Sequence, residues 1–428
     1  MQEWFKKAKL GIFIHYGIYS VGDVSESWSF HNGDISYKDY MKQLDGFTAE
    51  KFDANYLANL FKKSGAKYAV LTAKHHDGVS LFNTSVNDLT VLKKTPAKRD
   101  IIEEYTKALR EQDLKVGIYF SLIDWSSPYY RTVYGDGTLP ENYGTENPFA
   151  TPAGDPEEPE KWEKFLQHNN TQMKELMTNY GKVDLLWFDG DWERSAEQWK
   201  MAEFKKLLCS LNPDVICNSR MQGYGDYETP ELGIPVVAPK GYWEYCTPIN
   251  TSWGYRPSDN DYKTPRQIIR MFCDCITLGG NMLLDIGPKP DGTIDERQEE
   301  VLLSLGEFIH NNSEAIYETE KGLDYNFYLG GSTISPDKKT IYLFVYDKPI
   351  ESVCLKGIKT KVKSLNVLHS GKALNCTYTG GIPWSNIPGT MWIELPEEEM
   401  HKWVTVIKIQ LEDTLELYYG HGIVVTEN

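Results

Sequence analysis

Short apolar segments alternate with helical segments over the first three quarters of the chain. The apolar runs at residues 10–14, 68–73, 115–121 and 183–188 are each followed closely by polar or charged residues. Amphipathic patterns typical of helices separate most of these runs. A chain that alternates strand and helix in this way forms an α/β fold with a parallel sheet. So many repeats favour closure of the sheet into a (β/α)8-like TIM barrel.

The helical patterns can be located within a few residues. We expect helices over residues 48–64, 99–112, 159–180, 195–211, 264–277 and 295–311. Thr48 is the expected N-cap of the first, and Pro265 suits the first turn of the fifth. A stretch rich in Pro, Gly and Tyr at residues 126–157 is predicted to form a long loop over the barrel mouth, and such loops are often functional.

The character of the sequence changes after about Tyr325. Short alternating runs such as residues 340–345 and 404–409 are divided by Gly, Pro and Asn, which is typical of an antiparallel β-sandwich. We therefore expect a catalytic barrel over residues 1–325 and a C-terminal β-sandwich over residues 326–428. We expect the sandwich to support the barrel rather than to bind carbohydrate.

Charge and composition disfavour several classes of function. The chain carries 45 basic and 61 acidic residues, a formal net charge of −16, which disfavours nucleic acid or an anionic membrane as a partner. No run approaches the roughly 18 apolar residues of a membrane span, so we expect a soluble chain. The seven cysteines include no Cys-x-x-Cys pair, so neither a disulfide framework nor a zinc site is expected.

Polar and aromatic side chains collect where the predicted strands end. They are His15, His75, His76, Asp77, Asp124, Trp125, Trp187, Asp189 and Arg220. Parallel barrel strands open onto one mouth, so these side chains are expected to meet there. Asp189 ends an apolar run and Trp187 lies on the same side of that strand, a combination that suits attack on a sugar. We predict Asp189 as the nucleophile, although an Asp-Gly pair could also cap the next helix.

Retaining cleavage of a glycoside needs a second carboxyl group to protonate the leaving oxygen. Glu244 lies between Trp243 and Tyr245, and aromatic surroundings would raise its pKa as this role requires. We predict Glu244 as the acid/base, roughly 5 to 5.5 Å from Asp189 across one pocket. Alternatives in predicted loops are Glu193, Glu228 and Glu231.

A metal site is the first rival, because His15, His75, His76 and Asp189 could all be ligands. Adjacent His75 and His76 on a strand would point to opposite faces, which disfavours joint chelation unless the strand has already ended. We therefore predict no metal and no other cofactor. Arg220 could hold a sugar oxygen or the carboxylate of Asp189, and a purely structural ion pair is the alternative.

Five motifs, taken together and in order, resemble the α-L-fucosidases of glycoside hydrolase family 29. They are LGIFIHYG at residues 10–17, KHHDG at 74–78, WFDG at 187–190, WE at 243–244 with SWGY at 252–255, and GGNMLLDIGP at 279–288. The motifs are spread over the first three quarters of the chain. Each alone is weak, but five in the family's order are highly specific.

The resemblance implies a barrel followed by a β-sandwich, retaining hydrolysis of terminal α-L-fucose, and no metal. Asp189 is similar to the family nucleophile. The implied substrate-binding residues are His15, Trp28, His75, His76, Tyr119, Trp187 and Arg220. The expected partner is a fucosylated oligosaccharide or glycoconjugate, and a periplasmic or secreted location is favoured.

The chain departs from the family pattern at several positions. Tyr16 replaces a usual tryptophan, Phe120 stands where many members have a second tyrosine, and Asp285 stands where asparagine is frequent. Ser27 precedes Trp28 where members often have Glu-Trp, so either Glu26 or Trp28 could make that contact. A fucose-binding lectin and a retaining glycosidase for another sugar, such as galactose, remain alternatives.

Overall fold

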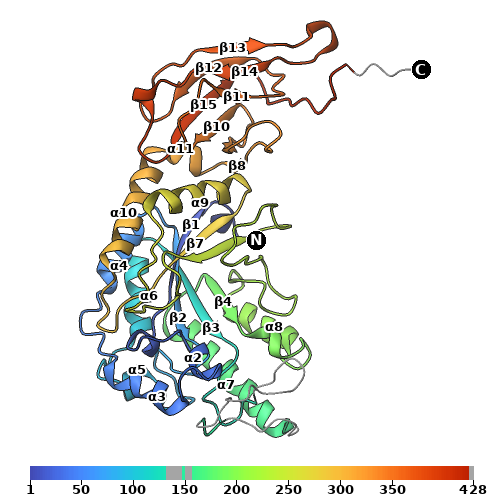
Figure 1. The fold of residues 1–428 in the computed structure, drawn as a ribbon. Coiled ribbons are helices and arrows are strands. Elements are labelled where there is room, and N and C mark those ends of the chain that lie inside the picture. The colour runs from blue at the N-terminus through green and yellow to red at the C-terminus, as the bar shows by residue number, and fades with distance from the viewer. Residues whose placement is uncertain (132–146, 150–156, 424–428) are drawn as a thin grey trace. The chain divides into compact units, whose positions relative to one another are not determined.

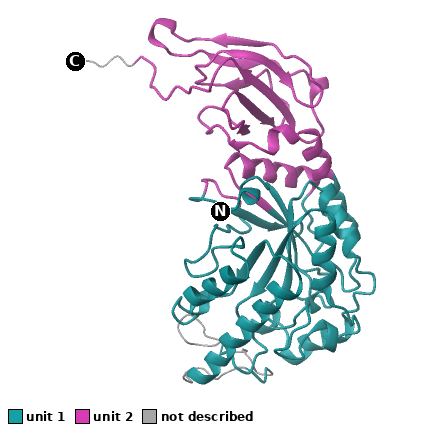
Figure 2. Cartoon of the chain, turned by 180° about the vertical axis from the view of Figure 1, so that it is seen from behind, with its two compact units in different colours: residues 1–233, 239–263, 283–303 teal, residues 234–238, 264–282, 304–428 magenta. Residues whose placement is uncertain are grey.

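The computed structural model describes residues 1–131, 147–149 and 157–423. The chain divides into two compact units (Figure 2). The first contains residues 1–233, 239–263 and 283–303, and the second contains residues 234–238, 264–282 and 304–428. The sequence-based boundary at residues 325/326 falls inside the second unit. Most of the predicted loop at residues 126–157 lies outside the described residues.

A seven-stranded sheet forms the centre of the first unit (Figure 1). Its order is β5-β4-β3-β2-β1-β7-β6. The strands are β1 (Leu10–Ile14), β2 (Tyr68–Lys74), β3 (Lys115–Ser121), β4 (Leu185–Asp189), β5 (Ile216–Cys217), β6 (Glu244–Pro248) and β7 (Asn281–Ile286). Strands β1 to β5 pair in parallel, and β1, β2 and β4 are buried along their whole length. The parallel α/β sheet predicted from the apolar runs is therefore confirmed.

The sheet has the form of a half-barrel rather than a regular closed barrel. Between β5 and β6, residues 227–231 make isolated parallel bridges: Tyr227 to Asn218, Glu228 to Trp243, and Glu231 to Cys246. Pro230 lies within this segment and has no amide hydrogen to donate to a ladder. The described part of the chain therefore gives seven strands in this sheet, and the closed eight-stranded barrel that we predicted is not confirmed.

All six predicted helical segments contain a helix. They are α4 (Ala54–Lys63), α6 (Ile101–Glu111), α7 (Pro159–Asn179), α8 (Met201–Leu211), α9 (Pro265–Thr277) and α10 (Glu296–Asn311). Thr264 caps α9, and Gln267 completes a reciprocal capping box. Helix α8 begins later than predicted, directly after Lys200, which has a φ of 52°.

Helix α4 also begins later than predicted, and its cap is a different residue. Asp53, not Thr48, accepts the capping hydrogen bond, from the amide of Tyr56 at 2.9 Å. The preceding residues are held outside the helix, because the amides of Ala49 and Lys51 donate to backbone carbonyls at positions 290 and 291. Tertiary hydrogen bonds therefore override the local helical pattern.

The second unit contains two antiparallel sheets (Figure 1). The five-stranded sheet has the order β12-β15-β10-β9-β8 and the three-stranded sheet the order β11-β14-β13. Their strands are β8 (Glu320–Lys321), β9 (Gly331–Ile334), β10 (Thr340–Val345), β11 (Val353–Leu355), β12 (Val362–Val367), β13 (Cys376–Thr379), β14 (Thr390–Ile393) and β15 (Thr405–Leu411). Alternate apolar residues of both sheets, including Leu343, Ile409 and Ile393, share one core.

No helix among the described residues has both the length and the apolar character needed to cross a membrane.

Candidate active site

A pocket of about 210 Å³ collects side chains from several strand ends of the first unit. It is lined by Phe13, His15, Glu26, Trp28, His75, Tyr119, Trp187, Asp189, Trp192, Arg220, Glu231 and Trp253. The volume is below the roughly 300 to 1,000 Å³ typical of sites for drug-sized ligands, and it suits a single sugar ring. All the predicted site residues line this pocket except His76 and Glu244.

Asp189 is the last residue of β4, and both of its carboxylate oxygens are held. Arg220 Nη1 donates to Oδ1 at 2.5 Å, and the Tyr119 hydroxyl donates to Oδ2 at 2.9 Å. His76 Nε2 lies 3.5 Å from the same Oδ2. Gly190 then turns the chain sharply with a φ of 82°. The carboxylate is thus fixed in orientation at the wall of the pocket.

Arg220 joins the nucleophile candidate to a second carboxylate. Its Nη1 bonds Asp189, its Nη2 bonds Glu231, and its guanidinium carbon lies 4.6 Å from the ring centroid of Trp187. Burial alone would lower the pKa of Arg220, but the charges of Asp189 and Glu231 raise it overall. Arg220 is therefore a permanent cation between two carboxylates at the pocket.

The three histidines are buried and each has one ring nitrogen engaged. Nδ1 of His15 lies 2.7 Å from Asp285, Nδ1 of His75 lies 2.6 Å from Ser27 Oγ, and Nδ1 of His76 lies 2.6 Å from a serine hydroxyl of β3. Burial lowers the pKa of His75 to about 4 and lowers the pKa of His15 and His76 as well. Near neutral pH the three rings are uncharged and suited to bonding hydroxyl groups.

The adjacent histidines play different parts. His75 lines the pocket, whereas His76 is outside the lining and has its Nε2 3.5 Å from Asp189 Oδ2. The role of His76 in binding substrate stays a prediction. Both residues follow the end of β2 (Tyr68–Lys74), and their ring centroids are 4.3 Å apart, so the alternation of strand side chains that we used against joint metal binding does not apply to them.

Two ambiguities in the sequence are resolved by side-chain direction. Tyr119 points into the pocket, while Phe120 lies on the other face of β3 with the ammonium of Lys74 4.2 Å from its ring centroid. Glu26 and Trp28 both line the pocket, so each is available for a sugar contact. Trp28 begins the short helix α2 (Trp28–His31), and Glu26 Oε1 accepts from a backbone amide at position 254 at 2.6 Å.

Glu244 requires a correction. It is the first residue of β6, whereas Asp189 is the last residue of β4, and Glu244 is fully buried without lining the pocket. Its carboxyl group accepts from Trp187 Nε1 at 3.0 Å and from the Tyr68 hydroxyl. Burial raises the pKa of Glu244 to about 7, in the predicted direction. Trp187 lines the pocket, whereas Glu244, which bonds its indole, is outside the lining, so Glu244 does not face Asp189 across the pocket.

Sequence reasoning missed several residues of the pocket wall. Phe13 and Trp253 belong to motifs quoted above, but neither was assigned a role. Trp192 follows the nucleophile strand, in the short 3-10 helix η3 (Asp191–Glu193). Glu231 was only one of three alternatives, because a glutamate in an irregular segment beside Pro230 carries no periodic signal.

The other polar residues at strand exits lie outside the pocket. Asp77 accepts from the Tyr40 hydroxyl at 2.6 Å, and Asp124 lies 3.8 Å from the buried ammonium of Lys74. Within the part of the chain that the structure describes, no three His, Cys, Asp or Glu side chains are grouped as metal ligands. The strand exits therefore include a buried ion cluster as well as the pocket.

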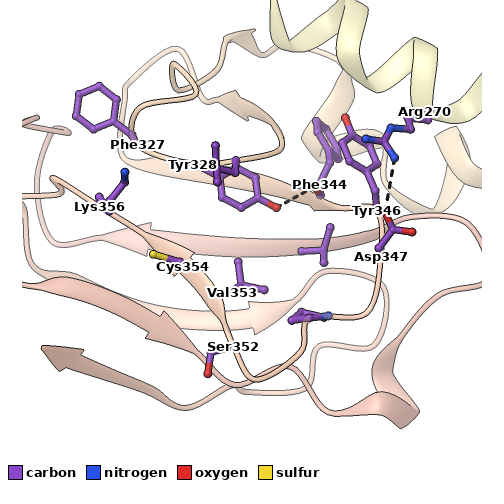
Figure 3. Close-up of a pocket in the computed structure, with 13 residues that line it drawn as sticks. Arg270, Phe327, Tyr328, Phe344, Tyr346, Asp347, Ser352, Val353, Cys354 and Lys356 are labelled. Atoms are coloured by element: carbon purple, nitrogen blue, oxygen red, sulfur yellow. Dashed lines mark hydrogen bonds and ion pairs between the residues drawn. The ribbon is translucent and has the colours of Figure 1, made fainter.

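A second pocket, of about 340 Å³, lies in the second unit (Figure 3). Arg270 packs 4.5 Å from the ring centroid of Tyr346 and lies 3.6 Å from Asp347. Asp347 is the one carboxylate among the residues that line this pocket. Because glycoside cleavage by the usual mechanism needs two carboxyl groups, the pocket of the first unit is the candidate active site.

The chain was compared with known families, curated proteins and solved structures. The family model described as Alpha-L-fucosidase matches residues 1–314. The chain is 30% identical over 391 residues to an alpha-L-fucosidase of Dictyostelium discoideum, which covers 82% of this chain and 79% of that protein.

Two solved structures extend the similarity over both units. Alpha-L-fucosidase isoenzyme 1 from Paenibacillus thiaminolyticus aligns with a TM-score of 0.85 and 32% identity, covering 96% of this chain and 98% of that one. A trapped covalent intermediate of a family 29 alpha-L-fucosidase from Bacteroides thetaiotaomicron, in complex with 2-fluoro-fucosyl fluoride, aligns with a TM-score of 0.80 and 26% identity, covering 95% of each chain.

Proposed function

Because this chain belongs to the alpha-L-fucosidase family of glycoside hydrolases, we propose that it releases terminal α-L-fucose with retention of configuration, through a covalent fucosyl ester on Asp189. The single observation that carries this proposal is the Arg220 guanidinium, which bonds Asp189 on one side and Glu231 on the other. A shared guanidinium keeps the two carboxyl groups close, as the roughly 5 to 5.5 Å separation of retaining enzymes requires. The trapped intermediate of the Bacteroides relative supports the same chemistry.

Asp189 is placed for attack on the anomeric carbon. Arg220 and Tyr119 hold its two oxygens, so little reorientation of the carboxylate is needed when a sugar enters. Attack forms the bond between Asp189 and the anomeric carbon and breaks the bond to the leaving oxygen. The Tyr119 hydroxyl and Arg220 remain to stabilise the carboxylate when it is released in the second step.

We propose Glu231, in place of Glu244, as the acid/base. Three carboxyl groups line the pocket: Glu26, Asp189 and Glu231. The Glu26 residue is only 6% exposed, and one of its oxygens is bonded to backbone. The Glu231 side chain is 33% exposed, so it can exchange protons with water and reach a leaving group outside the pocket.

The partners of Arg220 change between the two steps. In the first step Glu231 is protonated and gives its proton to the leaving oxygen, while the ionised Asp189 is the charged partner of Arg220. The ester then removes the negative charge of Asp189, which leaves Arg220 as the partner of the Glu231 carboxylate. That carboxylate takes a proton from a water molecule, the water oxygen bonds to the anomeric carbon, and the bond from that carbon to Asp189 breaks, which releases fucose.

The lining of the pocket suits fucose. Phe13, Trp187 and Trp253 supply apolar surface for the methyl group at C5, while the uncharged His15 and His75 can bond ring hydroxyls. Galactose would place an additional hydroxyl against apolar side chains, and an unpaired buried polar group costs about 1 to 3 kcal/mol. The expected substrates are fucosylated oligosaccharides or glycoconjugates. We also propose that residues 227–231 complete a closed barrel in place of a regular eighth strand.

Replacement of Asp189 tests the nucleophile. Asp189→Ala should lower turnover of an aryl α-L-fucoside by several orders of magnitude, and added azide should restore it with a product of inverted configuration. Near-native activity of Asp189→Ala would remove Asp189 from this role. Failure of azide to react in a folded variant would count against the double displacement.

Glu231 and Glu244 form a matched pair for the acid/base. Glu231→Ala should slow natural fucosides far more than aryl fucosides with good leaving groups, since the latter need little protonation. Azide should accelerate its reaction and give a product of retained configuration. Glu244→Gln should change both substrate classes by a similar factor. The reverse pattern would return the acid/base role to Glu244.

A further inference from the structure

Trp192 is unusual among the residues that line the pocket. It is 49% exposed, and it is the one member of the described pocket lining among the exposed large hydrophobic residues of the chain. Asp189 and Trp187 are buried in the same lining, so the exposed indole of Trp192 belongs to the rim of the pocket rather than to its floor. Its ring is nearly parallel to that of Trp28, with centroids 6.4 Å apart and an interplanar angle of 14°.

The backbone that carries Trp192 is held on both sides. Trp199 Nε1 donates to the carbonyl of Asp191 at 2.9 Å, and the amide of Gln222 donates to the Asp191 carboxylate at 2.9 Å. On the other side, Glu193 accepts from a tyrosine hydroxyl. An exposed indole on a fixed turn loses little conformational entropy when a ligand packs on it.

The size of the pocket defines what this indole would meet. The cavity of about 210 Å³ has room for one sugar ring. The second sugar of a fucosylated glycan must therefore lie outside it, on the side of the leaving oxygen and at the rim. Sugar rings present carbon-bound hydrogens on one face, and indole rings offer a large rigid surface for such a face.

Building on the proposed function, we propose that Trp192 is a stacking platform for the sugar that carries fucose. The enzyme then favours fucosides whose leaving group is a pyranose ring over fucosides with a small leaving group. Trp192 is a specificity-determining residue in this scheme. Asp189 and Glu231 remain the residues that cleave the glycosidic bond.

The first test compares two leaving groups. For a fucosylated disaccharide, Trp192→Ala should lower kcat/KM by about three- to tenfold, the range expected for one aromatic stacking contact. For α-L-fucosyl fluoride, whose leaving group has no ring, kcat/KM should stay within about twofold of wild type on the same reasoning. Trp192→Phe should keep most of the activity towards the disaccharide. Equal losses on both substrates, or no loss on either, would overturn the proposal.

The second test uses transfer of fucose to an added sugar. When methyl β-D-galactoside replaces water, its hydroxyl attacks the fucosyl ester, its proton goes to Glu231 and the Asp189 carboxylate leaves. Trp192→Ala should lower the ratio of transfer to hydrolysis at a fixed acceptor concentration. A ratio equal to that of wild type would show that Trp192 only supports the fold, and would overturn the proposal.

Tyr56→Ala is the matched control, because Tyr56 is a similarly exposed aromatic residue, at 43%, on α4 and outside the pocket. It should change neither the kcat/KM values nor the transfer ratio. Failure of the proposed function would look different: wild type itself would then give no transfer product, and Asp189→Ala would keep its activity.

Discussion

Replacing the buried carboxyl group of Glu244 should change how the stability of the protein depends on pH. Burial raises the pKa of Glu244 to about 7 from 4.5, although hydrogen bonds from Tyr68 and Trp187 oppose the rise. The folded protein therefore binds a proton more tightly at this site than the unfolded chain. Between pH 4.5 and 7 the free energy of unfolding falls as pH rises, and above the folded pKa the full penalty is present.

The size of the effect follows from the shift. The difference between 4.5 and about 7, at about 1.4 kcal/mol for each pKa unit, amounts to about 3 kcal/mol. Glu244→Gln cannot ionise, and its amide oxygen can still accept from Trp187 and Tyr68. The free energy of unfolding of the variant, minus that of wild type, should therefore rise by about 3 kcal/mol between mildly acidic and mildly alkaline pH.

Urea unfolding followed by tryptophan fluorescence, at constant ionic strength across this pH range, measures that difference. Other buried acids, such as Asp77 and Asp285, titrate in both proteins and largely cancel. Tyr68→Phe is a second perturbation: it removes a hydrogen bond that lowers the pKa of Glu244, so the loss of stability should extend to higher pH. A difference that stays flat with pH would refute the reasoning, because the carboxyl group would then ionise alike in both states.

Three further predictions concern the pocket. Gly190→Ala should lower both activity and melting temperature, because its φ is 82° and the added Cβ would lie 2.2 Å from Ile123 Cγ1; a variant equal to wild type in both measurements would contradict this. Tyr119→Phe removes a donor to Asp189 and should lower kcat/KM at least about tenfold in a protein that still folds, as checked by circular dichroism, since a hydrogen bond to a charged group is worth about 1.5 to 3 kcal/mol. A loss of less than twofold would show that the hydroxyl is not needed. Dialysis against EDTA should leave activity unchanged, and a loss that a divalent ion reverses would contradict the metal-free mechanism.

The sequence predicted the elements whose pattern is local and strong. Strands such as β2 and β4 are buried on both faces, and their continuous apolar runs revealed them directly. Helix α9 begins where Thr264 and Pro265 indicated. The start of α4 could not be predicted, because long-range hydrogen bonds to residues 290 and 291 exclude residues 49–51 from the helix.

The sequence predicted those site residues that lie at or near the C-terminal end of a strand. Asp189, His15 and Tyr119 meet because parallel strands deliver their carboxyl ends to one place. The prediction for Glu244 was only partly right. Its aromatic neighbours correctly indicated a raised pKa, but strand β6 starts at Glu244 instead of ending there. Glu231 has no periodic pattern around it, so only the folded geometry reveals its contact with Arg220.

The isolated bridges that hold residues 227–231 have a consequence for how such an enzyme can diversify. Asp189 is built into a strand with neighbours on both sides, so a one-residue insertion in that strand would disrupt the sheet. Glu231 lies outside the regular strands and is held by a bridge to Cys246 and by backbone hydrogen bonds on either side of it, but the chain that follows at residues 234–240 can lengthen or shorten at small cost. Libraries aimed at new glycosidic linkages should therefore vary residues 234–240 and leave Glu231 and the strands unchanged. Both carboxyl groups would then stay in place while the chain that follows Glu231 varies to meet a different aglycone.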